Sequence, residues 1–111
     1  MLEGTSSARV VLTTAATHED AVRLGRTLVE ERLAACATLL PGVESIYRWQ
    51  GKIETSSETL LLIKTESDRL AALESRLREI HSYQTPEFLV LEVESGSHPY
   101  LAWLNSCLHD G

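Results

Sequence analysis

Apolar and β-branched residues cluster or alternate in four stretches of the chain, a pattern that is typical of β-strands. The stretches are Arg9–Thr14, Ala37–Leu40 with its continuation Val43–Ile53, Glu58–Thr65 and Phe88–Glu94. Pro41-Gly42 interrupts the second stretch and suits a turn or a bulge. Gln50–Lys52 is the expected tip of a hairpin. The run Leu60–Ile63 in the third stretch predicts a central strand that is buried on both faces.

Other segments repeat apolar residues at the spacing of a helix. The first helix is expected to begin at His18, because Thr17 and Asp20 resemble a capping box with Asp in place of Glu or Gln. The apolar positions of the second helix are Leu70, Leu73, Leu77 and Ile80. Either Thr65 or Ser67 is the expected N-cap of this second helix.

The predicted order is strand, helix, strand, strand, helix, strand, with a short final helix opened by Ser97-His98-Pro99. Two right-handed crossovers joined by a hairpin give an α+β, ferredoxin-like βαββαβ sandwich with both helices on one face of the sheet. A chain of 111 residues fits one domain, which we expect over residues 9–111. Residues 1–8 are small and polar, and they predict a flexible N-terminal tail.

The predicted hairpin is longer than the helices that would cover it. Eleven extended residues from Val43 to Ile53 span about 35 Å, whereas a helix of about 15 residues spans about 22 Å. The far part of the hairpin, with Tyr47, Trp49 and Ile53 assigned to one face, should extend beyond the helices. Exposed aromatic edge strands favour pairing with another chain, so we expect an oligomer.

Composition excludes several classes of protein. Hydrophobic residues make up 43% and charged residues 23%, which is ordinary globular usage. No apolar run reaches the length of a membrane span, and Met1–Arg9 has no apolar signal core. Ten basic against sixteen acidic residues give a net charge of −6, which disfavours binding to a phosphate backbone. We therefore expect neither a membrane nor a nucleic acid as a partner.

Enzyme chemistry has no recognisable motif in this sequence. No GxSxG elbow and no glycine-rich phosphate loop occurs. Cys36 lies in an apolar stretch, where burial makes a thiol inert, and Cys107 is too distant in sequence for a CxxC motif. Without a signal peptide, we expect two reduced, buried thiols in a cytoplasmic protein, with a disulfide as the alternative. The protein is expected not to be an enzyme.

The four histidines share no metal-binding spacing such as HxxxH or HExxH. They are His18 and His98 at helix starts, His109 in the C-terminal tail, and His81 at the end of the second helix. A neutral imidazole at His81, with Glu87 nearby, suits copper or zinc. The alternative is a helix-terminal histidine that the helix dipole favours. Lys64 ends the most buried strand and needs an acidic partner or a ligand there.

Five segments in order resemble the CutA divalent-cation tolerance family. They are Glu31–Gly42, Ser45–Ile53, Leu62–Thr65, His81–Glu87 and Tyr100–Leu104. The resemblance runs from about Val10 to Leu108. It implies a ferredoxin-like protomer in a compact homotrimer, in which strands of neighbouring protomers join at their edges. It also implies a cytoplasmic protein linked to tolerance of copper and other divalent cations.

The resemblance transfers the proposed metal ligands of the family only in part. Thr13 stands where family members with proposed copper ligands have a cysteine at the end of the first strand. Ile80 stands where they have the first residue of a histidine pair. His81 remains as the candidate ligand for copper(II) or another divalent cation. Because a soft thiolate is absent, we expect cation binding to be weak or indirect.

The resemblance also marks a polar and aromatic cluster, Trp49, Lys64, Tyr83 and Glu87. These residues are the candidates for a ligand pocket between subunits, or else they only pack and pair at the trimer interface. An alternative function follows from the trimeric architecture that the family shares with PII-like signalling proteins. In that case Lys64 and Tyr83 would bind a small anionic ligand.

Overall fold

The computed structural model describes residues 2–3 and 6–109. The main elements are β2 (Ala8–Ala15), α1 (His18–Glu30), β3 (Cys36–Trp49), β4 (Lys52–Glu66), α2 (Leu70–Ile80), β5 (Leu89–Glu92) and α3 (His98–His109). The predicted βαββαβ order with a C-terminal helix is confirmed. Two short strands, β1 (Leu2–Glu3) and β6 (Gly96–Ser97), and the 3-10 helix η1 (Ser67–Arg69) are additions that the sequence patterns do not predict.

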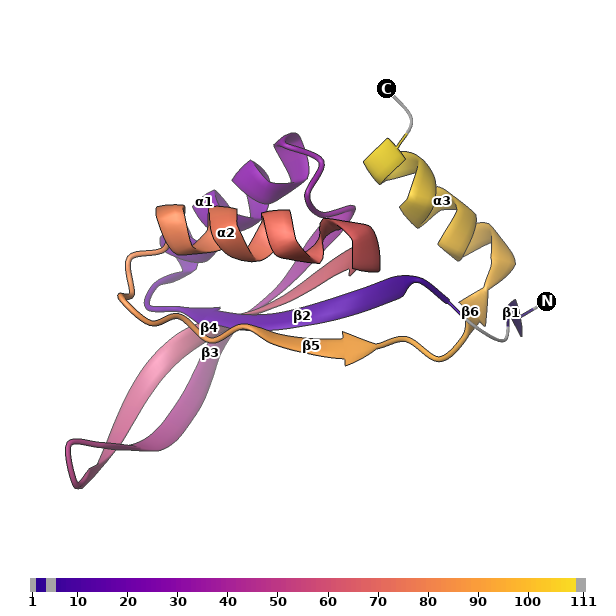
Figure 1. Ribbon diagram of the computed structural model, residues 1–111. Coiled ribbons are helices and arrows are strands. Elements are labelled where there is room, and N and C mark those ends of the chain that lie inside the picture. Colours follow the sequence, from indigo (N-terminus) through magenta and orange to yellow (C-terminus); the bar gives the residue numbers. More distant parts are fainter. Residues whose placement is uncertain (1, 4–5, 110–111) are drawn as a thin grey trace.

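The four main strands form an antiparallel sheet in the order β3-β4-β2-β5. Figure 1 shows α1 and α2 on one side of this sheet, whereas α3 lies beyond its end. The core lies between the sheet and these two helices, and its largest members are Val11, Leu24, Leu28, Leu61, Ile63, Leu73 and Leu77. Within the described residues, no helix is long and apolar enough to span a membrane.

Burial in the central strand β4 alternates instead of covering both faces. Leu61 and Ile63 are fully buried under the helices, while Leu60 and Leu62 are only half-buried. The predicted burial on both faces is therefore wrong for the single chain, because helices cover one face only. Pairing places a second set of apolar residues on the uncovered side, which we call the open sheet face: Val10, Leu12, Leu40, Leu60, Leu62, Leu89 and Leu91.

Helix α1 begins where the sequence predicts. The Thr17 hydroxyl accepts a hydrogen bond from the Asp20 amide at 3.1 Å. Gly25 faces β3, and a Cβ added there would lie 3.1 Å from the Ala37 Cβ. The missing side chain thus allows α1 to pack closely on the sheet.

The predicted cap of α2 is wrong. Thr65 is buried in β4, and its hydroxyl donates to the Leu33 carbonyl at 2.7 Å, so it is not available to a helix. Ser67 begins η1, and no side chain caps η1 or α2. The buried leucines Leu73 and Leu77 hold α2 on the sheet instead.

The hairpin β3–β4 has the predicted irregularities. The register shifts between Leu40 and Val43, and Gly42 has φ of 70°. The tip has Gln50 at φ 50° and Gly51 at φ 79°, the positive values that a tight two-residue hairpin turn needs. The turn therefore depends on left-handed backbone conformations, which Gly51 adopts without strain.

The faces of the hairpin differ from the prediction at one residue. Trp49 pairs with Lys52, and Arg48 pairs with Ile53. Directly opposite residues share a face, so Ile53 lies on the side of Arg48 and not with Tyr47 and Trp49. The predicted face of Ile53 is wrong, because alternation does not continue unbroken through a turn.

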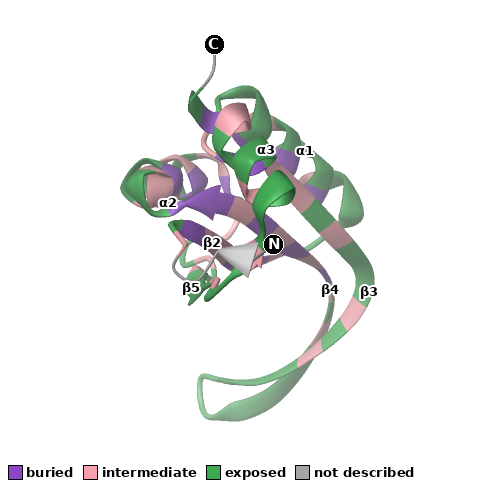
Figure 2. Ribbon diagram, turned by 90° about the vertical axis from the view of Figure 1, so that its right-hand side faces the viewer, coloured by how far each residue is buried: buried purple, intermediate pink, exposed green. Residues whose placement is uncertain are grey.

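The hairpin extends past the helices, as its length predicts (Figures 1 and 2). Ile46, Trp49 and Ile53 are 66%, 60% and 61% exposed. Large apolar side chains thus project from a two-stranded ribbon that the other described elements leave exposed.

Helix α3 and the N-terminal segment pack together at the far end of the sheet. Leu104 and Leu108 form a second apolar cluster with Ala8 and Ala35. Part of the expected tail 1–8 has regular structure, because residues 2–3 form β1 beside β6 and Ala8 begins β2. Residues 1 and 4–5 of that expected tail lie outside the described residues. The boundary between tail and domain stays a prediction.

Candidate functional site

His81 follows the last residue of α2 and is 8% exposed. Its Nδ1 accepts a hydrogen bond from the Tyr83 amide at 2.9 Å, and its Nε2 lies 2.8 Å from the Thr14 carbonyl oxygen. A carbonyl oxygen only accepts, so Nε2 carries the proton and donates it. The imidazole is therefore neutral, and both ring nitrogens are engaged inside the protein.

The surroundings of His81 offer little to a soft cation. Thr13 is fully buried, and its hydroxyl oxygen has no hydrogen-bond partner among the described residues. Ile80 packs against the core. A cation at His81 would have to break one of the two hydrogen bonds of the ring. His81 stays a predicted ligand, and Glu87, exposed on the loop before β5, stays its predicted neighbour.

Tyr83 forms a short hydrogen bond with a carboxylate on β4. Its hydroxyl donates to Glu58 Oε2 at 2.5 Å. Burial raises the pKa of Glu58, but hydrogen bonds from Ser45, Tyr83 and Thr14 outweigh burial, and the net pKa is below its usual value. Burial and the neighbouring carboxylate raise the pKa of the Tyr83 hydroxyl far above its usual value. At neutral pH the pair is thus a charged carboxylate and a protonated phenol.

The four residues predicted for an intersubunit pocket do not meet within one chain. Lys64 lies on the open sheet face, where its Nζ donates to the Thr38 hydroxyl at 3.0 Å, in place of the expected acidic partner. Tyr83 instead contacts Glu58, which lies six positions before Lys64 in β4. Six extended residues separate the two positions by about 20 Å along the strand. Trp49 is at the tip of the hairpin. A pocket that joins these residues needs neighbouring chains, and it stays a prediction.

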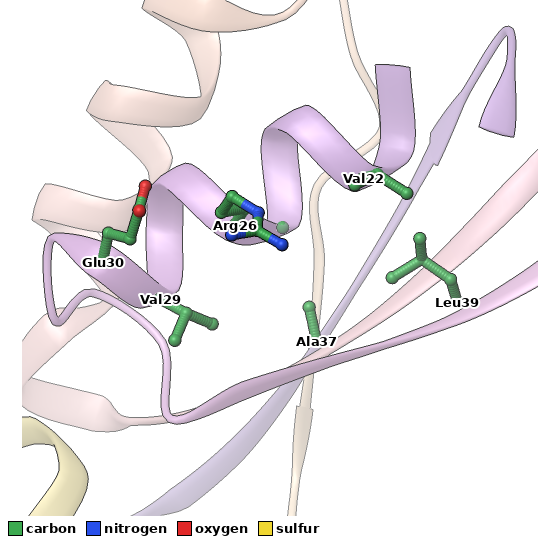
Figure 3. A pocket seen from close by; sticks show the side chains of 7 residues that line it. Val22, Arg26, Val29, Glu30, Ala37 and Leu39 are labelled. Carbon is green, nitrogen blue, oxygen red and sulfur yellow. The ribbon is translucent and has the colours of Figure 1, made fainter. Parts of the chain in front are cut away.

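A groove in the described surface lies away from these residues. A groove of about 390 Å³ runs between α1 and the edge strand β3. Figure 3 shows that Val22, Val29, Ala37 and Leu39 line it, with Arg26 and Glu30 on the helix above. Its walls are mostly apolar, and none of the predicted site residues lies in it. Cys36 and Cys107 are also outside it, and both are free and half-buried.

Sequence patterns did not indicate one group of ligand atoms. Among the described residues, Glu66, Asp68 and His109 place one ligand atom each within 4.8 Å of the others. His109, which was expected in the tail, is the last residue of α3. Glu66 is the last residue of β4, and Asp68 lies in η1. In the sequence, only the two carboxylates are close together, two positions apart. The His109 imidazole lies beside them because α3 packs against the end of β4.

Comparison with known proteins gives one consistent result. The family model described as CutA1 divalent ion tolerance protein matches residues 9–107. A relative from Pectobacterium atrosepticum, named divalent-cation tolerance protein CutA, is 50% identical over 99 residues, which cover 89% of this chain and 90% of the relative.

Two solved structures show the same architecture. CutA from Xylella fastidiosa is 44% identical with a TM-score of 0.91, and the match covers 93% of this chain and 99% of that one. CutA from Synechococcus elongatus PCC7942 is 40% identical with a TM-score of 0.94, and the match covers 97% and 96% of the two chains. The four-stranded sheet and the three helices are thus shared with solved CutA proteins.

Proposed function

Because this chain belongs to the CutA1 divalent ion tolerance family, we propose that it acts in tolerance of divalent cations, copper among them, by weak or indirect cation binding and without catalysis. The family match over residues 9–107 carries this proposal, since it spans nearly the whole described fold. The cytoplasm is the compartment we propose, and two unpaired, half-buried cysteines are compatible with it.

The polar networks of the chain support a role without catalysis. A general base needs a lone pair directed at a substrate, and His81 uses both ring nitrogens internally. The Glu58 carboxylate accepts from Tyr83, and its lowered pKa makes it a weak base. These groups are arranged to hold the loop after α2 in place.

We also propose that the protein acts as a homotrimer. The open sheet face is largely apolar, the two helices α1 and α2 lie on the other side of the sheet (Figure 1), and the sheet of the described residues ends in two edge strands, β3 and β5. The hairpin adds exposed Ile46, Trp49 and Ile53 beyond the helices. Burial of these surfaces against two further copies would remove both edges and bring Trp49, Lys64, Tyr83 and Glu87 of different chains together.

Titration calorimetry with copper(II) tests direct binding. The untagged wild-type protein should bind copper(II) saturably, and magnesium at the same concentrations should give less heat, because imidazole and carboxylate ligands favour copper. The His81→Ala variant shows whether this histidine is a ligand. Absence of any saturable copper(II) binding at millimolar concentration would contradict a direct role.

A further inference from the structure

We propose that Glu66, Asp68 and His109 bind one divalent transition-metal cation, of the zinc type, where β4, η1 and the end of α3 meet. Only the biological purpose of this site rests on the proposed role in cation tolerance. Its geometry and chemistry are independent of the family, and its test is binding alone.

The three ligand atoms are already close to a metal-binding arrangement. His109 Nε2 lies 2.9 Å from Glu66 Oε1 and 3.5 Å from Asp68 Oδ2. Ligand atoms bound to zinc at about 2.0–2.2 Å in a tetrahedron are separated by distances of this order. A cation between the three atoms therefore requires small side-chain adjustments rather than a change of fold.

The donor set suits a zinc-type cation. One imidazole nitrogen and two carboxylate oxygens leave a position for water or a further ligand. The side chain of Glu66 is 9% exposed, whereas that of Asp68 is 57% exposed and can rotate towards a cation. Within residues 6–109 no lysine or arginine forms an ion pair with Glu66, so this buried carboxylate has no cationic partner of fixed charge. A bound cation would supply that charge.

Neighbouring residues hold the ligands in place. The Asn105 amide donates to Glu66 Oε1 at 3.0 Å, and the Ser7 hydroxyl donates to Glu66 Oε2 at 3.2 Å. Arg69 donates to the Leu108 carbonyl at 2.7 Å, which fixes the end of α3 beside η1. Such supporting contacts orient metal ligands before the metal binds.

Arg69 also sets the state of His109 before a cation binds. Its guanidinium lies 3.1 Å from Nδ1, so Nδ1 accepts, and Nε2 carries the proton that it donates to Glu66. For a cation to bind Nε2, the ring proton of His109 must move to Nδ1. Arg69 then loses its hydrogen bond to Nδ1 but keeps its hydrogen bond to the Leu108 carbonyl. The proton count is unchanged by this exchange. The lost hydrogen bond makes the expected binding moderate rather than tight.

Glu66 is also reached from solvent. A cavity of about 310 Å³ between the N-terminal segment and α3 is lined by Glu66, Asn105, Ser6 and Ser7, among others. Neither Asp68 nor His109 lines this cavity, so it gives water access to the Glu66 carboxylate alone.

Titration calorimetry with Zn²⁺ on the full, untagged chain at pH 7 tests the site. We expect one Zn²⁺ per chain with micromolar affinity. His109→Gln and Asp68→Asn should each weaken binding about tenfold or more, because each removes a ligand. If His109→Gln fails to fold, Asp68→Asn still tests the site, because Asp68 is exposed and its substitution should leave folding intact. His18→Gln, which removes an exposed histidine at the start of α1, is the matched control and should bind as the wild type does.

Equal Zn²⁺ affinity in the wild type, His109→Gln and Asp68→Asn would overturn the site, as would the absence of binding at millimolar Zn²⁺. Such a failure differs from failure of the proposed function, which growth in copper tests separately.

Discussion

Hydrogen bonds fix the ionisation of the polar side chains around the end of α2. His81 is neutral because one ring nitrogen must donate to Thr14 and the other must accept from Tyr83. Glu58 is charged because three hydroxyl groups donate to it, which outweighs the effect of burial. These states follow from which atoms are opposite one another, and residue types alone do not reveal them.

The lowered pKa of Glu58 predicts a loss of stability in acid. Its folded pKa is below the reference value of 4.5, so the unfolded chain binds more protons as the pH falls towards and below that value. The contribution of Glu58 is present above pH 4.5 and is lost as the pH falls through the folded pKa. Glu58→Gln should flatten this part of the profile.

Thermal unfolding from pH 7 to pH 3 measures the difference. The stability of the wild type should fall more steeply below about pH 4.5 than that of Glu58→Gln. Parallel profiles for the two proteins would show that Glu58 has the same pKa in both states.

Local patterns predicted the elements well wherever local chemistry decides. Thr17 caps α1 as expected, and the hairpin tip falls at Gln50 and Gly51. The errors occur where distant residues decide. Threonine is a common N-cap residue, but the Thr65 hydroxyl donates to the carbonyl of Leu33, more than thirty positions earlier. The burial of Leu60 and Leu62 depends on whether another chain covers the open sheet face.

Close packing of α1 on β3 predicts a specific cost at Gly25. Gly25→Val places a branched side chain where even a Cβ lies 3.1 Å from Ala37, so it should destabilise the protein by about 1–3 kcal/mol. The control Arg26→Val adds the same side chain one position later, on the exposed side of the helix. It should stay within about 1 kcal/mol of the wild type. Urea denaturation measures both, and equal values for the two variants would contradict the close contact.

At the scale of the whole molecule, the single chain exposes apolar surfaces that a stable monomer would bury. The open sheet face, the two edge strands and the hairpin all lie outside the core. The length of the hairpin predicted this excess, and the fold confirms it. The Glu66, Asp68 and His109 group could not be predicted, because α3 brings the histidine to β4 across more than forty positions of sequence.

The oligomer predicts a clear effect at Trp49. Trp49→Asp puts a charge on the exposed hairpin tip, where an interface would desolvate it, and should break the assembly. Light scattering should give about three times the chain mass of 12.3 kDa for the wild type and the single-chain mass for the variant. Ala72→Asp, on the exposed side of α2, is the control and should keep the wild-type mass. A variant that keeps the wild-type mass would show that Trp49 is not in the interface.

Growth in copper tests the central claim most directly. A strain of the source organism that lacks this gene should stop growing at a lower copper concentration than its parent. The intact gene, restored on a plasmid, should return growth to the parental level. If the strain without the gene grows as its parent does at every copper, zinc and nickel concentration, the proposed role in divalent-cation tolerance is contradicted.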